Sequence, residues 1–580
     1  MKRKIKFIQF KSIIKSFNTQ FLIIFLKVII IATLSILISK TFFEINSLYF
    51  SLSYIEYILF ISGWISSVSF LILLSLKNNS IGKIFIVILL ALLGLTVDIC
   101  YSTLNDTLSA EAISLFWNER SYFTEATITY WNILIIPLIR FIIFIFVILY
   151  PVKPSIKIKN SLLVIIFALS FIPTYFLSSK PNGNGIDGLQ PHIAPIPYLY
   201  HLSLMHFNYK KITRKDVEIN ITHNSLSDNI VLIIDESVRG DFIDLNYNRG
   251  TTPHLIKFKN RIINFGLALS SYNRSNGSHA LLRMGINPND FISKDGCKIL
   301  FSNPLIWQYA HKAGYKTYYI DAQKSTYQNY MDSTEAKFID SIIWIKNSEG
   351  NFWKDHILAK KINQILRVPG KKFIIGVKDG VHFHYENRYP NKECIFEPVM
   401  TLGIPTNDRL KLINSYRNAI RWNTDIFFKI LLENPNLNST IIIYTSDHGQ
   451  NLFDAGTNDV NLRHGTNKNS LPQEVIVPLL LITDNVHLKE KLNIAAKINF
   501  NICSHYQIFP TILYFMGYDK NKVKEKYYLT LFDKMDHLPG FSNGNLRFGK
   551  RNLIEVSNDL TSYIDPEIEH LITLLQKNQN

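Results

Sequence analysis

The sequence is poor in cysteine and contains no internal repeat or low-complexity tract. Only four cysteines occur in its 580 residues. Of these, Cys297 and Cys394 lie in polar segments, so one disulfide bond between them stays open, and their spacing alone does not establish it. The sequence therefore indicates neither a repeat array nor a disulfide framework.

Clustered basic helices with interleaved aromatic residues are also missing, although the formal net charge is +17. This pattern gives no support to a nucleic-acid partner. The surplus of positive charge instead fits attraction to an anionic lipid surface.

Long apolar runs, in contrast, fill the first 180 residues. Five of them have roughly the 20 residues that cross a bilayer, namely 21–40, 55–76, 83–101, 131–150 and 161–178. The basic start before the first run resembles a signal peptide, but no small-residue cleavage site follows and four more runs do. We therefore predict an uncleaved transmembrane domain of five helices over residues 1–180.

The charges of the loops predict the orientation of these spans. The amino terminus and the turns at 77–83 and 151–160 are basic, whereas the 102–130 loop is acidic. Basic loops stay in the cytoplasm. The amino terminus is therefore expected inside the cell and everything after about residue 180 outside.

Residues 181–228 form a linker in which glycine, proline and aromatic residues alternate before a basic patch. Such a segment is typical of amphipathic elements that lie on a membrane surface, and equally of a simple tether. Both interpretations stay open.

Residues 229–580 have the pattern of an α/β domain. Predicted strands at 229–235, 315–321, 371–378, 439–446 and 478–483 alternate with helix-like stretches such as 302–313 and 408–432. This alternation predicts a central, mostly parallel sheet flanked by helices.

Two of the predicted strands end in side chains of the kind that bind metals. NIVLIIDESVRGD (229–241) reaches Glu236, and IIIYTSDHGQ (441–450) reaches Asp447 and His448. Either run alone reads as a buried strand that ends in a polar turn. Because ligands bind at the carboxyl ends of strands in open α/β sheets, the two runs together indicate a metal site.

A nucleophile is predicted in SSYNRSNGSHALLRMGINP (270–288), a small-polar cluster followed by a helix-like run. A hydroxyl at a helix start is favoured because the helix dipole and free amide groups stabilise an alkoxide and an attached phosphate. Ser271, Ser275 and Ser278 compete for this role, and N-capping explains any one of them. Ser278 directly precedes the HALLRM run and is the first choice.

Two further segments carry histidines. DGVHFHYENRYP (379–390) contains His382 and His384, and NLRHGT (461–466) contains His464. A lone loop histidine is usually a solvated side chain. His464 follows Asp447 and His448 closely in sequence, which favours a place beside the predicted metal site.

These segments together resemble the sulfatase and alkaline phosphatase superfamily. The resemblance rests on DESVRGDFIDLNYNRGTTPHL, SDHG, RHGT, QEVIVP and SHYQIFPTIL, in this order. With five preceding spans, ESVRGD followed by TTP is similar to the bacterial phosphoethanolamine transferases that modify lipid A or the lipopolysaccharide core. This implies a multi-pass protein of the inner membrane with a periplasmic, alkaline phosphatase-like catalytic domain.

The resemblance also implies the roles of site residues. The expected ion is zinc, with manganese as the alternative, and its implied ligands are Glu236, Ser278, Asp447 and His448. Aligning Arg274 with a family cysteine places Ser278 at the position of the nucleophile. Ser275 is the alternative, and a serine stands where the family usually has threonine.

His382 and His464 match histidines that contact the phosphate or a second metal ion in the family. The RYP loop lacks the Ser-His-Gly-Pro sequence that is usual in the family, and His384 is the alternative to His382. The implied reaction transfers phosphoethanolamine from phosphatidylethanolamine to lipid A or the lipopolysaccharide core through a covalent serine intermediate.

Three alternatives stay open. One is a phosphoglycerol transferase that uses phosphatidylglycerol. A second is a membrane-anchored sulfatase or phosphodiesterase, although NRSNGSHALLR lacks the proline of the usual formylglycine motif. A third is a non-enzymatic membrane scaffold, which loss of a metal ligand would favour.

Overall fold

The computed structural model divides the chain into two compact units. One comprises Met1–Lys210 with Arg547–Lys550, and the other Lys211–Leu546 with Arg551–Asn580. The structure describes residues 2–39, 53–104, 107–110, 112–113, 116, 123–152, 156–179, 186–209, 212–346, 351–401, 408–433, 437–454, 464–465, 470–547 and 553–571. Each unit is described by itself.

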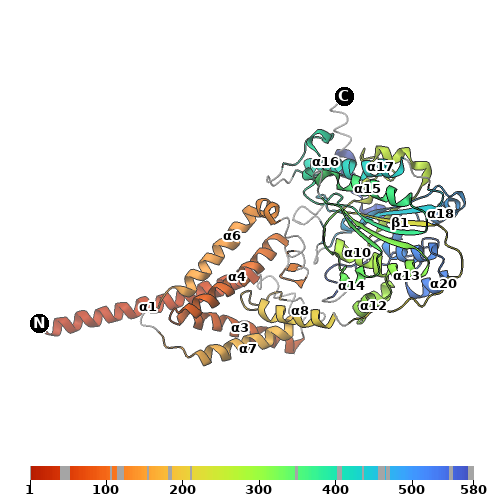
Figure 1. Cartoon of the computed structure of the whole chain (residues 1–580). Helices are drawn as coiled ribbons and strands as arrows, with labels where there is room; N and C mark the ends of the chain where they lie inside the picture. Colours follow the sequence, from red (N-terminus) through yellow and green to blue (C-terminus); the bar gives the residue numbers. More distant parts are fainter. Residues whose placement is uncertain are drawn as a thin grey trace. The chain divides into compact units, whose positions relative to one another are not determined.

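The first unit is helical (Figure 1). Its helices are α1 (Lys2–Ser39), α3 (Tyr54–Leu76), α4 (Ile81–Leu104), α6 (Phe123–Leu149), α7 (Asn160–Ser178) and α8 (Pro195–Tyr209). Among the described residues, 5 helices are long and apolar enough to cross a membrane, within α1, α3, α4, α6 and α7. The five predicted spans are therefore confirmed, whereas much of the acidic 102–130 loop lies outside the described residues.

The spans bury one face and expose another. Leu71, Leu90 and Ile148 are almost fully buried between the helices, whereas Ile142 and Phe176 are 63% and 59% exposed. Apolar side chains on an outer surface suit a helix bundle whose surroundings are lipid.

Part of the predicted linker belongs to this helical unit. Gln190 Nε2 donates to Ser35 Oγ of α1 at 3.2 Å, and the Tyr101 hydroxyl of α4 donates to Asp187 at 2.9 Å. Buried hydrogen bonds thus hold the segment that precedes α8 against the helices α1 and α4.

The second unit is built on an 8-stranded sheet with the order β4-β3-β5-β1-β6-β7-β2-β8. Its strands are β1 (Asn229–Asp235), β2 (Ile262–Leu269), β3 (Lys316–Asp321), β4 (Ser341–Trp344), β5 (Lys372–Val377), β6 (Thr440–Ser446), β7 (Ile476–Ile482) and β8 (Cys503–Ser504). The first five strands in this order, β4, β3, β5, β1 and β6, are parallel to one another. Strand β7 runs antiparallel to β6 and β2, and β8 is parallel to β2. The predicted mostly parallel sheet is confirmed.

Apolar side chains alternate between two cores, one on each face of the sheet. In β1, Ile230, Leu232 and Ile234 point into one core and Val231 and Ile233 into the other. This follows from the two-residue period of a strand. A central strand covered on both faces is therefore apolar throughout, as the sequence of β1 is.

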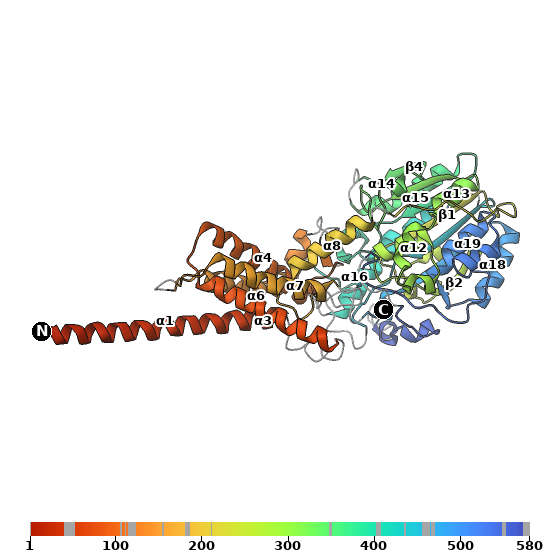
Figure 2. The same cartoon turned by 90° about the horizontal axis from the view of Figure 1, so that it is seen from below.

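Helices cover both faces. They are α9 (Pro253–Lys257), α10 (Ser275–Met284), α11 (Pro288–Ile292), α12 (Gly296–Ser302), α13 (Ile306–Lys312), α14 (Ser333–Ala336), α15 (Lys354–Leu366), α16 (Arg409–Ile420), α17 (Ile426–Leu432), α18 (Val486–Ile498), α19 (Ile508–Phe515) and α20 (Lys520–Lys526). Figure 1 shows α15, α16 and α17 on one side of the sheet and α10 and α13 on the other. Figure 2, seen from below, shows α12 and α19 over the side that carries α10.

No disulfide bond joins any of the four cysteines, all of which the structure describes. The disulfide that was left open between Cys297 and Cys394 is therefore absent. The physical reason is their placement, since the α12 helix of Cys297 packs on one face of the sheet and Cys394 packs against the core of the other face.

Candidate metal centre

The candidate site forms where β1 and β6 end side by side. The two strands are parallel neighbours, and their last residues, Asp235 and Ser446, are register partners. The chain beyond each strand therefore emerges at the same edge of the sheet. A hydrogen bond of 2.9 Å from Asp447 N to Asp235 O continues the pairing by one residue, which brings Glu236 and Asp447 together.

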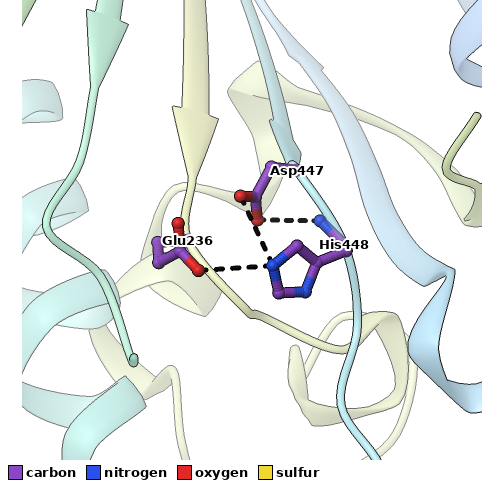
Figure 3. A group of neighbouring side chains, drawn as sticks. All are labelled: Glu236, Asp447 and His448. Atoms are coloured by element: carbon purple, nitrogen blue, oxygen red, sulfur yellow. Dashed lines mark hydrogen bonds and ion pairs between the residues drawn. The ribbon is translucent and has the colours of Figure 1, made fainter. Parts of the chain in front are cut away.

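Glu236, Asp447 and His448 form a compact cluster (Figure 3). One ligand atom from each lies within 4.8 Å of the others, and all three residues are buried. His448 Nε2 lies 3.4 Å from Glu236 Oε1 and 3.6 Å from Asp447 Oδ2. Figure 3 shows the imidazole facing both carboxylates.

Hydrogen bonds to the backbone hold two of these side chains, Asp447 and His448, and turn one atom of each toward the other members of the cluster. Asp447 Oδ1 accepts from Ser237 N at 3.0 Å and from His448 N at 2.8 Å. Asp447 Oδ2 is buried without a hydrogen-bond partner among the described residues. His448 Nδ1 lies 2.8 Å from Gly449 O. A proton on Nδ1 is donated to this carbonyl, so Nε2 is the acceptor whenever the ring is neutral.

Burial and charge shift the pKa values of the cluster. Burial lowers the pKa of His448, but the Asp447 and Glu236 carboxylates overcome this and raise it to about 9. Burial, followed by the charge of Glu236, raises the pKa of Asp447 well above its usual value. Both carboxylates therefore stay ionised together only with a positive charge between them, which a proton on His448 or a bound cation supplies.

The donor set fits a divalent zinc ion. A histidine nitrogen and carboxylate oxygens are common zinc ligands, and a catalytic zinc site keeps a position for a further oxygen ligand. The unsatisfied Asp447 Oδ2 is the kind of buried polar atom that an ion explains.

Ser275 supplies the hydroxyl at this cluster. It is the first residue of α10, after Arg274 in an extended N-cap conformation. Ser275 Oγ lies 3.2 Å from Glu236 Oε2 and 3.3 Å from His448 Nε2. Ser275, the alternative nucleophile predicted from the sequence, is thus the serine that contacts the predicted metal ligands.

Ser278, the first choice from sequence, lies elsewhere. Its side chain is fully buried one turn into α10. Its oxygen donates to the Asp447 main-chain carbonyl at 2.6 Å and lies 3.1 Å from His505 Nδ1. These contacts tie α10 to the end of β6. The sequence estimate of where the helix begins was one turn late, which is why it favoured Ser278.

The structure brings two of the candidate histidines to the cluster. The ring of His464 stacks on His448 with centroids 4.0 Å apart, and the ring of His382 lies 6.1 Å from that of His464. His384 instead lies 3.7 Å from Glu386. Of the NLRHGT segment, only His464 and Gly465 are among the described residues.

A glycine allows the His382 loop to pass close to Glu236. Gly380 has a φ of +59°, and a Cβ atom built there would lie 2.6 Å from Glu236 Cβ. Only glycine combines this backbone conformation with such a close approach.

Sequence reasoning missed three residues near the cluster. Gln323 Nε2 donates to Glu236 Oε2 at 2.9 Å. His279 is fully buried with Nε2 3.9 Å from Asp447 Oδ2, and His505 lies 2.9 Å from Thr445 Oγ1. Gln323 follows the predicted strand 315–321. Because ligands bind at the carboxyl ends of strands in open α/β sheets, the reasoning that led to Glu236 and Asp447 could also have found Gln323.

Comparison with known proteins gives a family match. The family model described as Sulfatase matches residues 228–518. Two curated relatives are both described as Kdo(2)-lipid A phosphoethanolamine 7''-transferase. The protein from Escherichia coli (strain K12) is 24% identical over 303 residues, and that from Salmonella typhimurium (strain LT2) is 24% identical over 311 residues. In each case the match covers 50% of this chain and 51% of the relative, so it spans about half of their length.

A solved structure shares the fold over most of the chain. The integral membrane protein lipooligosaccharide phosphoethanolamine transferase A (EptA) from Neisseria meningitidis superposes with a TM-score of 0.59 at 16% sequence identity. The match covers 85% of this chain and 96% of that chain. The arrangement of a helical unit followed by an α/β unit is therefore a known fold.

Proposed function

The chain belongs to the sulfatase family, and we propose that it is a zinc-dependent transferase that moves phosphoethanolamine from phosphatidylethanolamine to lipid A or the lipopolysaccharide core. The observation that carries the proposal is a serine hydroxyl at a helix start, within 3.3 Å of a buried Glu-His pair beside Asp447. The described activity of the two relatives supports the choice of transferred group.

The proposed location is the inner membrane, with the amino terminus in the cytoplasm and the catalytic domain in the periplasm. The five apolar helices and the basic turns between them support this. We also propose that the chain consists of a transmembrane domain (1–180), a linker with membrane-surface segments (181–228) and a catalytic domain (229–580). Because donor and acceptor are both lipids, a membrane anchor keeps the catalytic domain at their surface.

Glu236, Asp447 and His448 are proposed to hold the metal ion together with Ser275. Their nitrogen and oxygen donors favour zinc, and manganese is the alternative. The chemistry supplied by a zinc ion there is a lowered pKa of the serine hydroxyl and charge neutralisation at the phosphate.

Ser275 acts as the nucleophile in the proposed first step. Its hydroxyl hydrogen bonds to Glu236 Oε2 at 3.2 Å, which orients Oγ at the site. Oγ forms a bond to the phosphorus of phosphatidylethanolamine, and the bond from phosphorus to the diacylglycerol oxygen breaks. Ser275 loses its hydroxyl proton in this step and the diacylglycerol oxygen takes up one, so diacylglycerol leaves as the alcohol and phosphoethanolamine remains on Ser275.

The second step regenerates the serine. An acceptor oxygen of lipid A or the core attacks the same phosphorus, the bond to Ser275 Oγ breaks, and Oγ takes up the proton that the acceptor releases. His464 and His382 lie next to the cluster and are proposed to contact the phosphate oxygens, where positive or hydrogen-bonding groups stabilise the charge of both transition states. The amino-terminal end of α10 adds its partial positive charge.

A transfer assay tests the proposal. The purified full-length protein in detergent, supplied with phosphatidylethanolamine labelled in its ethanolamine group and with lipid A, is expected to label the acceptor. Chelation of zinc and the Ser275→Ala variant should each abolish labelling. Ser278→Ala is the matched control and should retain it.

Two outcomes would contradict the proposal. Release of free phosphoethanolamine without labelled acceptor would indicate a phosphodiesterase. Labelling only from phosphatidylglycerol that is labelled in its head group would identify the phosphoglycerol transferase alternative.

A further inference from the structure

Gln323 reaches the cluster of Glu236, Asp447 and His448 from the end of a third strand. It follows β3, which is parallel to β5 and therefore ends at the same edge of the sheet as β1. Its Nε2 donates to Glu236 Oε2 at 2.9 Å. We propose that Gln323 is a positioning residue that fixes the Glu236 carboxylate for metal binding; this inference rests on the metal site proposed above.

The two oxygens of Glu236 have separate partners. Oε1 accepts from Ser237 Oγ at 2.7 Å and lies on the side of His448 Nε2. Oε2 accepts from Gln323 at 2.9 Å and from Ser275 at 3.2 Å. Rotation about the terminal torsion of a glutamate is soft. Hydrogen bonds to both oxygens therefore decide which oxygen faces the ion and which faces the serine.

Gln323 is itself held in the required orientation. Gln328 Nε2 donates to Gln323 Oε1 at 2.9 Å and to Asp321 Oδ2 at 3.0 Å. Because Oε1 is occupied in this way, the amide group turns Nε2 toward Glu236. A chain of hydrogen bonds thus runs from Asp321, the last residue of β3, to a predicted metal ligand.

The fold of this loop does not depend on the Gln323 side chain. Asp321 Oδ1 accepts from the main-chain N of Gln323 at 2.7 Å and from that of Lys324 at 3.2 Å. These contacts survive when the side chain is changed. Gln323→Leu, which keeps the size but removes the amide, should therefore affect the metal site and leave the loop in place.

Zinc affinity of the full-length protein in detergent, measured by competition with a chromogenic chelator, is the direct test. Loss of a partner that hydrogen bonds to a metal ligand typically weakens binding by 10–100-fold. We expect the dissociation constant of zinc to rise by about this factor in Gln323→Leu, with activity restored by excess zinc. Gln328→Leu should raise the dissociation constant of zinc by a smaller factor, because it removes the hydrogen bond that orients the Gln323 amide but leaves that amide in place.

Gln364→Leu is the matched control, since Gln364 is exposed on α15. Its zinc affinity should equal that of the wild type. Melting temperatures measured without metal should agree for Gln323→Leu and wild type, whereas the increase on adding zinc should be smaller in Gln323→Leu.

The inference is overturned if Gln323→Leu binds zinc within twofold of wild type, or if its metal-free form melts markedly lower. In the first case the proposed function stands, because wild type still binds zinc and transfers the group. If the wild type itself binds no zinc, both the inference and the zinc dependence of the proposed function fail.

Discussion

At the scale of single residues, the site depends on charges that are costly to bury. Asp447 and Glu236 are buried beside each other, and the buried Asp447 Oδ2 makes no hydrogen bond to any described residue. A buried charge is tolerated when it is paired or binds a metal. The cost of this arrangement in the metal-free protein is the physical reason to expect strong cation binding.

Asp447→Asn tests this charge requirement. The substitution keeps the shape but removes the negative charge, so we expect zinc to bind at least about 10-fold more weakly and the rise in melting temperature on adding zinc to be smaller than in the wild type. Isothermal titration calorimetry and thermal unfolding measure both effects. Zinc binding equal to that of the wild type would exclude Asp447 as a ligand.

Gly380 carries a steric prediction at the same scale. Gly380→Ala places a Cβ atom 2.6 Å from Glu236 Cβ at a φ of +59°. We expect a loss of about 1–3 kcal/mol in the free energy of unfolding and weaker zinc binding, since Glu236 must move. Chemical unfolding measures the first effect and chelator competition the second. Wild-type values for both would show that the loop yields without disturbing Glu236.

At the scale of elements, strands were more predictable from sequence than helix starts. The apolar runs of β1 and β6 predicted the strand ends after which Glu236 and Asp447 follow, because a buried strand ends where polar residues begin. The start of α10 was placed one turn late, because nothing local separates Ser275 from Ser278 as a first helical residue. Strand β2 was not predicted, since Asn264 and Gly266 interrupt its apolar pattern.

The α15 helix gives a prediction for the pH dependence of stability. His356 is buried against Trp353 and Trp422, and burial lowers its pKa to about 4. Below pH 6.5 the unfolded chain binds a proton that the folded protein does not. The stability contribution of neutral His356 is therefore present above pH 6.5 and is lost as the pH falls toward 4, by about 1.4 kcal/mol per pH unit.

His356→Gln preserves the hydrogen bond to the Trp422 carbonyl but removes the titration. Between pH 6.5 and 5, its free energy of unfolding should fall by about 2 kcal/mol less than that of the wild type. Urea unfolding at both pH values measures the difference. Equal pH slopes for the two proteins would show that His356 titrates normally in the folded state.

At the scale of the whole molecule, five apolar helices precede an α/β unit that carries the candidate site. The membrane spans could be predicted from sequence because twenty consecutive apolar residues have few other structural uses. The packing of residues 186–194 against the spans could not, because it depends on buried hydrogen bonds between distant residues such as Gln190 and Ser35.

Cysteine labelling of intact cells tests the proposed orientation. Asn493→Cys on exposed α18 should react with a membrane-impermeant maleimide, whereas Asn79→Cys between α3 and α4 should react only after the membrane is broken. Both are placed in a Cys394→Ser background, because the other native cysteines are buried. The reverse labelling pattern would contradict a periplasmic catalytic domain.

The most direct measurement is peptide mass spectrometry of the full-length protein after incubation with phosphatidylethanolamine and no acceptor. We predict a phosphoethanolamine adduct on Ser275 that is absent from Ser275→Ala and present in Ser278→Ala. An adduct on Ser278, or none on either serine in a protein that transfers the group, would contradict the mechanism.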